Sequence, residues 1–325
     1  MDYSVLVKSE DTDIYHISWT KYRNEVTDFI IEAIESYYIK SRLKQSGKKR
    51  LSSYMDMKAI VEKLGKKPTL AIWGAGGCND IDVRRLANYF RLVLIDHNLD
   101  KISSVREKYG FSEKECVCID LKFWDFTETD YLMIEALIKD RVDRQEIEKY
   151  INKLVESMDD ISGKDIPHFD FSIVAGLTSQ LNSRFAALFH INEYPHNMYE
   201  FLSRINHIAV SRLLNVIMDL TEKLIIFGYE KEAVLCDEVN RLEQRISNLN
   251  DEIFSNQEEV FCLGSRIAGN DCLTDGLNDL VQTGSLISFY ERYMEWNFIN
   301  EKSYLMHFVS FEKTFKISKK IKLCR

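Results

Sequence analysis

Proline and long apolar runs are scarce in this sequence. Only three of the 325 residues are proline, which argues against long proline-rich linkers. No apolar run approaches the about 18 residues that a membrane-spanning helix needs. The first residues, MDYSVLVKSEDTD, are acidic and lack the apolar segment of a signal peptide. We therefore expect a cytoplasmic protein that has no membrane partner.

The sequence also lacks an excess of positive charge and any cysteine pattern that would bind zinc. It contains 43 lysines and arginines against 51 aspartates and glutamates, so the net charge is −8. Nucleic-acid binding needs clustered positive charge, so we expect no nucleic-acid partner. The basic stretches 44–50 and 313–325 are interpreted as a solvated turn and tail. The seven cysteines form no C-x-x-C pair, which favours free thiols and no metal site.

Short apolar runs alternate with helical patterns from residue 69 onward. Strands are predicted at 69–73, 91–96 and 116–120, with a helix after each of the first two. The sheet resumes at 169–177 and 223–230, with a long helix ending near 220 between them, and residues 231–258 are read as a charged helix. The closing runs 287–298 and 303–313 have so short a connection that they must be antiparallel.

These patterns predict an α/β fold with a doubly wound, mostly parallel seven-stranded sheet and an antiparallel C-terminal hairpin. Helical patterns at 14–45 and before Gly65 predict a helical N-terminal cap over residues 1–66. A Rossmann-like domain follows over 67–325, with two extra helices inserted at about 127–160. The cap and the insertion are expected near the carboxyl ends of the strands, where such folds bind ligands.

The stretch TLAIWGAGGCNDIDV, residues 69–83, is an apolar strand that runs into three glycines. Such a turn binds either a dinucleotide or S-adenosylmethionine, and Asp96, 22 residues after Gly74, suits the ribose of both. A dinucleotide turn needs G-x-G-x-x-G, but its third glycine is replaced here by Asn79. Asp80 and Asp82 would also lie unfavourably beside a pyrophosphate, whereas they suit a cationic ligand.

The whole pattern resembles the class I, Rossmann-like, S-adenosylmethionine-dependent methyltransferases over roughly residues 67–312. WGAGGCND resembles their glycine motif, LVLIDHN their ribose-acid motif, VCIDLKFWD their adenine-side acid motif and FSIVAGLTSQL their fourth-strand motif. The resemblance implies S-adenosylmethionine as cofactor and S-adenosylhomocysteine as product. It implies that the cofactor is bound by Gly74, Ala75, Gly76, Gly77, Asn79, Asp96, His97, Asp120, Leu121, Ala175 and Gly176.

Two positions depart from that family. An acid often stands two residues before the first motif glycine, and here that residue is Ile72. The usual third glycine is replaced by Cys78. The fourth strand is not followed by the Asn/Asp-Pro-Pro-aromatic motif of enzymes that methylate nucleobase or amide nitrogens, so we expect a small-molecule or peptide acceptor, as in natural-product or peptide modification.

The acceptor atom is expected to be a carboxylate or hydroxyl oxygen first and a nitrogen second. His190 and His196 are candidate bases, because histidine titrates near neutral pH. Candidate substrate-binding residues are Tyr22, Gln180, Tyr194 and Tyr199. Two other functions stay open: a nicotinamide-dependent oxidoreductase, and a non-catalytic Rossmann-like protein that binds a nucleoside or a partner. The acceptor's identity and the oligomeric state do not follow from the sequence.

Overall fold

The computed structural model describes residues 19–46, 56–121, 128–140, 142–156, 166–181, 198–235, 239–255, 263–265, 267, 269–299 and 302–314. Most of the basic stretch 44–50 and all but two residues of the stretch 313–325 lie outside these ranges, as do His190, His196 and Tyr194.

One seven-stranded sheet organises the chain, with the strand order β3-β2-β1-β4-β5-β7-β6. The first five strands pair in parallel, and β7 lies antiparallel between β5 and β6. This confirms the predicted sheet and its closing hairpin. The strands are β1 (Thr69–Trp73), β2 (Arg91–Asp96), β3 (Cys116–Asp120), β4 (Phe169–Ala175), β5 (Thr221–Leu235), β6 (Leu286–Ile299) and β7 (Lys302–Lys313).

The central strands are continuously apolar because both of their faces are covered. Four of the five residues of β1 and five of the six residues of β2 are buried. The chain moves from β1 outward through β2 to β3, then returns to place β4 on the other side of β1. The order therefore reverses between β1 and β4, and ligands of open α/β sheets bind at the carboxyl ends of the strands at such a point.

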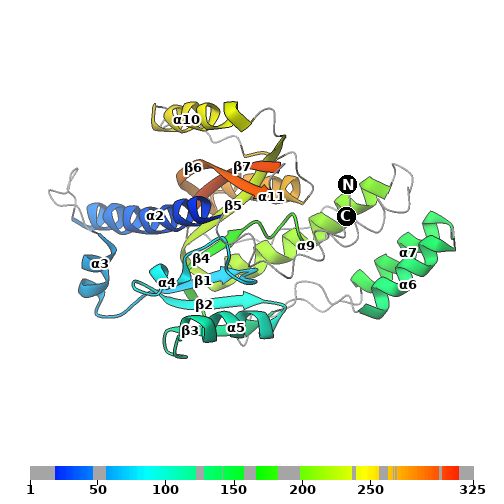
Figure 1. Cartoon of the computed structure of the whole chain (residues 1–325), viewed down its shortest axis with the longest axis horizontal. Helices are drawn as coiled ribbons and strands as arrows, with labels where there is room; N and C mark the ends of the chain where they lie inside the picture. Colours follow the sequence, from blue (N-terminus) through cyan, green and yellow to red (C-terminus); the bar gives the residue numbers. More distant parts are fainter. Residues whose placement is uncertain are drawn as a thin grey trace.

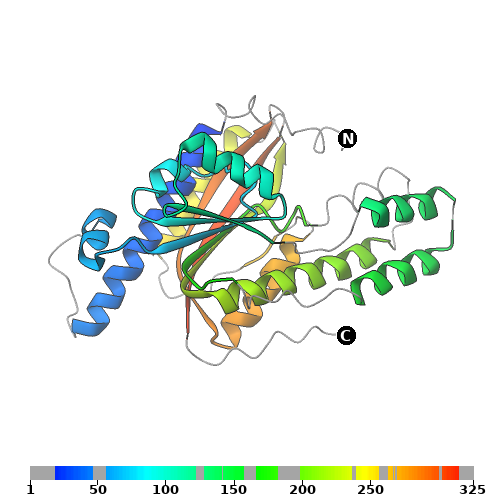
Figure 2. The same cartoon turned by 90° about the horizontal axis from the view of Figure 1, so that it is seen from below.

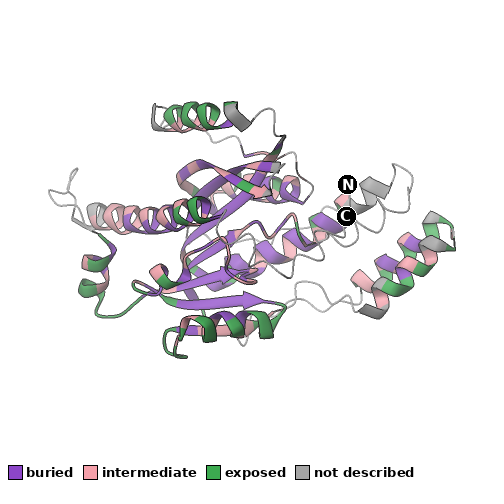
Figure 3. Ribbon diagram, viewed as in Figure 1, coloured by how far each residue is buried: buried purple, intermediate pink, exposed green. Residues whose placement is uncertain are grey.

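Two layers of helices cover the sheet (Figures 1 and 2). On one face, α2 (Thr20–Ser46), α3 (Met57–Leu64), α4 (Val83–Leu86) and α5 (Leu99–Tyr109) share one hydrophobic cluster with the strands. On the other face, α9 (Met198–Leu220) and α11 (Asn270–Gln282) form a second cluster. Figure 3 shows the buried strands between these layers. The helix α10 (Val239–Ser255) packs on β5, β6 and β7.

The two inserted helices are α6 (Glu128–Lys139) and α7 (Arg144–Glu156). They lie beyond the carboxyl-end side of the sheet, at the right of Figures 1 and 2. Arg204 of α9 donates a hydrogen bond to Asn152 of α7, with 2.7 Å between Nη2 and Oδ1. The insertion predicted for 127–160 is thus present as a pair of helices, and α9 joins it to the main body.

Three expectations need correction. The predicted charged helix at 231–258 begins only at Val239, because residues up to Leu235 extend β5 and pair with β7. The helix expected after the glycines is a single turn, Val83–Leu86. The helix α11 had no counterpart in the sequence prediction. In the described part of the chain, no helix has the length and apolar character needed to span a bilayer.

Candidate functional site

The turn after β1 is held against the end of β2. The backbone N–H groups of Gly74 and Ala75 both donate to the carbonyl oxygen of Ile95, at 2.8 and 3.1 Å. Gly74 has a φ of 67°, and a Cβ there would lie 2.6 Å from Cδ1 of Leu177. Gly76 has a φ of 48°, and its Cβ would meet nothing closer than a backbone oxygen at 3.9 Å. The turn therefore requires glycine at these two positions and leaves open space beside Gly76.

Cys78 explains one departure from the family pattern. It is the only non-glycine residue with a positive φ in the described ranges, at 51°, and its N–H donates to the carbonyl of Ala75 at 2.8 Å. The position therefore has the left-handed conformation that a third glycine would adopt without strain. Cysteine keeps the backbone of the turn and adds a thiol that is 3% exposed, whose pKa burial raises well above its usual value.

Asp96 ends β2 and is bound to the glycine turn. Its Oδ2 accepts the N–H of Gly76 at 2.8 Å, and its Oδ1 accepts the N–H of Asn98 at 3.0 Å. Nδ1 of His97 lies 3.1 Å from the same Oδ1. Burial opposes ionisation of Asp96, but these hydrogen bonds outweigh it and hold its pKa below the usual value. The bond to Asp96 raises the pKa of His97 against the effect of its own burial.

Asp120 ends β3 directly beside Asp96 in the strand register. Its side chain is exposed, and the next residue, Leu121, donates its N–H to the carbonyl of Asp96 at 3.0 Å. Neighbouring parallel strands thus place two carboxylates at one edge of the sheet, as the motif spacing predicted.

The turn after β4 faces the end of β5. Gly176, with a φ of 60°, donates its N–H to the carbonyl of Gly228 at 2.9 Å. A Cβ on Gly176 would lie 3.8 Å from Oε1 of Glu230. Gly176, which the family resemblance assigned to the cofactor, therefore lies next to a carboxylate that the sequence did not single out.

Glu230 is the acid that sequence reasoning missed. It is 4% exposed, and it accepts hydrogen bonds from Oγ of Ser179 at 3.0 Å and from Nδ2 of Asn270 at 2.7 Å. One signal was available: KLIIFGYE is an apolar strand that ends in an acid, as the strands before Asp96 and Asp120 do. The bulge that follows in β5 begins at this residue.

The helix α2 is attached to the glycine turn by three polar contacts. Nε of Arg23 donates to the carbonyl of Asn79 at 2.7 Å. Oγ1 of Thr27 accepts the N–H of Asp82 at 3.0 Å. Arg85, in the short helix after the turn, forms an ion pair with Asp28 at 2.6 Å. A helix of the segment predicted as an N-terminal cap therefore contacts the glycine turn and the short helix after it.

Tyr22 lies in α2 and packs on the closing hairpin. It is 4% exposed, and its ring stacks on Trp296 with 5.4 Å between centroids. Its hydroxyl interacts electrostatically with Asp80 and Glu230, and together with burial they raise its pKa well above the usual value. Burial also raises the pKa of Asp80 to about 6; Arg23 opposes this shift and Glu230 adds to it. The negative charges of Asp80 and Glu230 thus contribute to the raised pKa of Tyr22.

Gln180 and Tyr199 are the other predicted substrate-binding residues that lie in the described ranges. Gln180 lies in the turn after β4, where its N–H donates to the carbonyl of Leu177 at 3.0 Å. Tyr199 falls in α9. No group of three or more His, Cys, Asp or Glu side chains within the described ranges is arranged to hold a metal ion.

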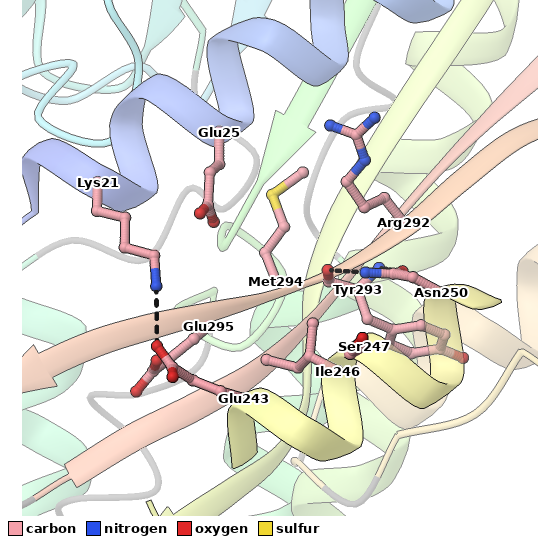
Figure 4. A pocket seen from close by; sticks show the side chains of 10 residues that line it. All are labelled: Lys21, Glu25, Glu243, Ile246, Ser247, Asn250, Arg292, Tyr293, Met294 and Glu295. Atoms are coloured by element: carbon pink, nitrogen blue, oxygen red, sulfur yellow. Dashed lines mark hydrogen bonds and ion pairs between the residues drawn. The ribbon is translucent and has the colours of Figure 1, made fainter. Parts of the chain in front are cut away.

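A separate hollow of about 310 Å³ lies at the edge strand β6, between α2 and α10 (Figure 4). Lys21 of α2 and Glu243 of α10 form an ion pair across it, with 3.3 Å between Nζ and Oε1. The amide of Asn250 accepts the N–H of Tyr293 at 2.8 Å and donates to its carbonyl at 3.1 Å. This amide takes the place of a neighbouring strand on β6. Since Arg23 and Thr27 face the glycine turn from the other flank of α2, the hollow is distinct from the site above.

Comparisons with known proteins give structural likeness only. No protein-family model matches the chain, and no curated protein sequence matches it. Among solved structures, the N-methyltransferase NodS from Bradyrhizobium japonicum WM9 is 11% identical, with a TM-score of 0.33 over 76% of this chain and 85% of that chain. Magnesium protoporphyrin IX methyltransferase from Synechocystis PCC 6803, with bound SAH, is 6% identical, with a TM-score of 0.36 over 90% and 99%. A SAM-dependent methyltransferase from Methanosarcina mazei is 10% identical, with a TM-score of 0.37 over 76% and 92%.

These likenesses are distant, and they say nothing about the residues of the site. The chain itself has a seven-stranded sheet with an antiparallel β7, a glycine turn after β1, and acids at the ends of β2 and β3. In these features it resembles the class I methyltransferases, as the sequence motifs predicted.

Proposed function

We propose that the chain is an S-adenosylmethionine-dependent methyltransferase that acts on a small molecule or peptide. The observation that carries the proposal is the position of Asp96. Its carboxylate is ionised, 7% exposed, and lies at the carboxyl end of β2, bonded to Gly76 of the turn after β1. An ionised carboxylate accepts hydrogen bonds from two neighbouring hydroxyls, which is the requirement of a ribose.

The surrounding residues fit the rest of such a cofactor. The open space beside Gly76 allows a ligand to approach the backbone, and Asp120 lies next to Asp96 for a base amino group. Asp80 supplies a negative charge in the same turn, which suits a cationic sulfonium and ammonium. We assign the cofactor to the turn 74–79, to Asp96 with His97, to Asp120 with Leu121, and to Ala175 with Gly176.

S-adenosylmethionine supplies an activated methyl group when bound. The chain's own contribution is to hold the acceptor in line with that group and to exclude water. The hydrogen bonds between α2 and the segment 79–82 support a part in this for α2 and its Tyr22. We propose on this basis that the segment 1–66 works as a cap on the Rossmann-like domain.

A nicotinamide cofactor fits less well. The turn lacks the third glycine of a dinucleotide motif, and Asn79 occupies that place. A pyrophosphate there would also lie beside Asp80 in the same turn, and the repulsion between like charges costs binding free energy.

Calorimetric titration with S-adenosylhomocysteine, NAD and NADP tests the assignment. We expect micromolar binding of S-adenosylhomocysteine alone. Asp96→Ala should weaken that binding by about 1–3 kcal/mol, because the ribose hydroxyls lose their partner. Asp100→Ala, an exposed acid on α5, is the matched control and should bind as the wild type does. Heat from a nicotinamide dinucleotide alone, or unchanged affinity in a folded Asp96→Ala variant, would overturn the proposal.

A further inference from the structure

The side chain of Asn270 joins three segments that are far apart in the sequence. It is 0% exposed at the first position of α11, where its Nδ2 donates to the carbonyl oxygen of Glu230 at 3.1 Å and to Oε2 of Glu230 at 2.7 Å. Its Oδ1 accepts the hydroxyl of Thr178, in the turn after β4, at 2.5 Å. Both polar atoms of the amide are therefore bonded, and a buried amide with these partners holds α11, β5 and the turn after β4 together.

Two further contacts hold the turn after β4 from the same direction. Oγ of Ser179 donates to Oε1 of Glu230 at 3.0 Å. A Cβ on Gly269, which has a φ of 88°, would lie 2.5 Å from the carbonyl oxygen of Thr178. The backbone before α11 thus touches the backbone of the turn, and only glycine allows so close an approach. These contacts fix the turn against α11 and the end of β5.

The opposite side of the same turn touches the glycine turn after β1. Leu177 directly precedes Thr178, and a Cβ on Gly74 would lie 2.6 Å from Cδ1 of Leu177. Packed side chains transmit a displacement because protein interiors contain few voids that could absorb it. A line of contacts therefore runs from Asn270 through the turn after β4 to the glycine turn.

We propose that Asn270 is a positioning residue of the cofactor site. Through its hydrogen bond with Thr178 it sets the place of the turn after β4, and through Leu177 it sets the place of the glycine turn. This rests on the proposed methyltransferase function, which assigns S-adenosylmethionine to the glycine turn. The side-chain partners of Asn270 are Thr178 and Glu230, and neither is assigned to the cofactor, so Asn270 acts through them. A binding site keeps its geometry within about 0.5 Å only when such supporting residues are themselves fixed.

Two variants of Thr178 separate the hydrogen bond from packing. Thr178→Val keeps the shape of the buried side chain and removes the donor to Asn270, whereas Thr178→Ser keeps the hydroxyl and removes a methyl group. We expect Thr178→Val to bind S-adenosylhomocysteine roughly tenfold more weakly than the wild type, because Oδ1 of Asn270 loses its donor. Thr178→Ser should restore the affinity to within about twofold of the wild type, because the hydrogen bond is kept. Packing alone would give the reverse order.

Asn270→Ala removes the hydrogen bonds to both Thr178 and Glu230, and it should weaken binding at least as much as Thr178→Val does. Thr274→Val is the matched control. Thr274 is buried in the same helix, but its hydroxyl donates to the carbonyl of Asp271 within that helix. This variant should bind as the wild type does. Urea denaturation of each variant verifies that the titrated protein is folded, and Thr178→Val keeps the test valid where Asn270→Ala does not fold.

Calorimetric titration of S-adenosylhomocysteine into the full-length protein and its variants decides the matter. Unchanged affinity in folded Thr178→Val, equal weakening in Thr274→Val, or weaker binding by Thr178→Ser than by Thr178→Val would overturn the positioning role. The methyltransferase assignment would stand in each of these cases, because the wild type still binds. If the wild type binds no S-adenosylhomocysteine, the proposed function itself fails, and the positioning role of Asn270 fails with it.

Discussion

Asp96 and Asp80 lie at the same edge of the sheet, but their surroundings shift their pKa values in opposite directions. Asp96 is surrounded by donors: two backbone N–H groups and the ring of His97 lower its pKa. Asp80 is half-buried, and desolvation raises its pKa to about 6; the charge of Glu230 adds to this shift and that of Arg23 opposes it. The turn after β1 therefore has one flank that holds a stable anion and another where negative charge is only weakly compensated.

This contrast teaches how one residue type serves two purposes in one site. On the β2 side, the charge of Asp96 is already stabilised, so it can accept hydrogen bonds from neutral hydroxyls. At Asp80 the raised pKa indicates that desolvation outweighs the compensation of its negative charge by Arg23. The substitutions below test the contrast, and they run from the largest expected effect to the smallest.

Gly74→Ala should disturb both flanks together. Gly74 has a positive φ, and its Cβ would collide with Leu177 of the turn after β4. Backbone strain and the collision should lower the free energy of unfolding by about 2–4 kcal/mol, measured by urea denaturation. Gly77→Ala is the matched control, because Gly77 has no positive φ and its Cβ would meet only the side chain of Asn79, at 3.2 Å. Equal losses in the two variants would contradict the role given to Gly74.

Asp96→Asn should break the β2 flank alone. Asparagine replaces one carboxylate oxygen by an NH₂ group, which cannot accept a hydrogen bond from the backbone N–H of Gly76 or Asn98. The loss of one of these hydrogen bonds should lower the free energy of unfolding by about 1–3 kcal/mol. The contribution of Asp96 is present above its ordinary carboxyl pKa and lost as the pH falls through its lowered folded pKa. The stabilisation that protonated His97 adds through Asp96 is lost as the pH rises through the raised pKa of His97. Urea denaturation should therefore show the full loss near about pH 5.5 and a smaller loss below about pH 3.

Asp80→Asn should have the opposite sign. Because the folded pKa is raised from 3.8 to about 6, the folded protein loses stability from this group as the pH rises through that window. Removing the charge should raise the free energy of unfolding above pH 6 by up to about 2 kcal/mol, discounted for partial exposure and for the lost attraction of Arg23.

Near about pH 3 the Asp80→Asn variant and the wild type should be almost equally stable, because the carboxyl group is then largely protonated in both the folded and the unfolded chain. Urea denaturation at both pH values measures the difference. A variant less stable than the wild type at neutral pH would show that Asp80 is favourably paired.

The smallest expected effect is the difference in stability between the Cys78→Gly and Cys78→Ala variants. Glycine usually costs more than alanine, but the φ of 51° at this position favours glycine. We expect Cys78→Ala to lose about 1 kcal/mol of stability from the buried thiol, and Cys78→Gly to be no less stable than Cys78→Ala. Thermal unfolding of the two variants side by side decides this. A clearly less stable glycine variant would mean that the left-handed conformation at this position is not what the folded chain needs.

The sequence predicted the strands and most of the helices because their patterns are local. Local sequence predicts the strands from the apolar runs of β1 and β2, and it predicts the turn from the glycines at 74 and 76. The acids Asp96 and Asp120 lie at the expected strand ends. The helix α11 escaped prediction because Gly276 interrupts it. The packed structure supplies the reason for that glycine: a Cβ there would lie 2.7 Å from Cδ1 of Leu214 in α9.

The sequence by itself determined the sheet, the glycine turn and the acid at the end of β2, since each depends on residues close in the chain. Only the tertiary structure brought Arg23 of α2 to the glycine turn, where it donates to the carbonyl of Asn79. Glu230 looks like any other acid at a strand end until Ser179 and Asn270, from distant segments, enclose it. The physical reason is that burial and charge compensation depend on every neighbour in space, whereas strand and turn patterns depend mainly on neighbours in sequence.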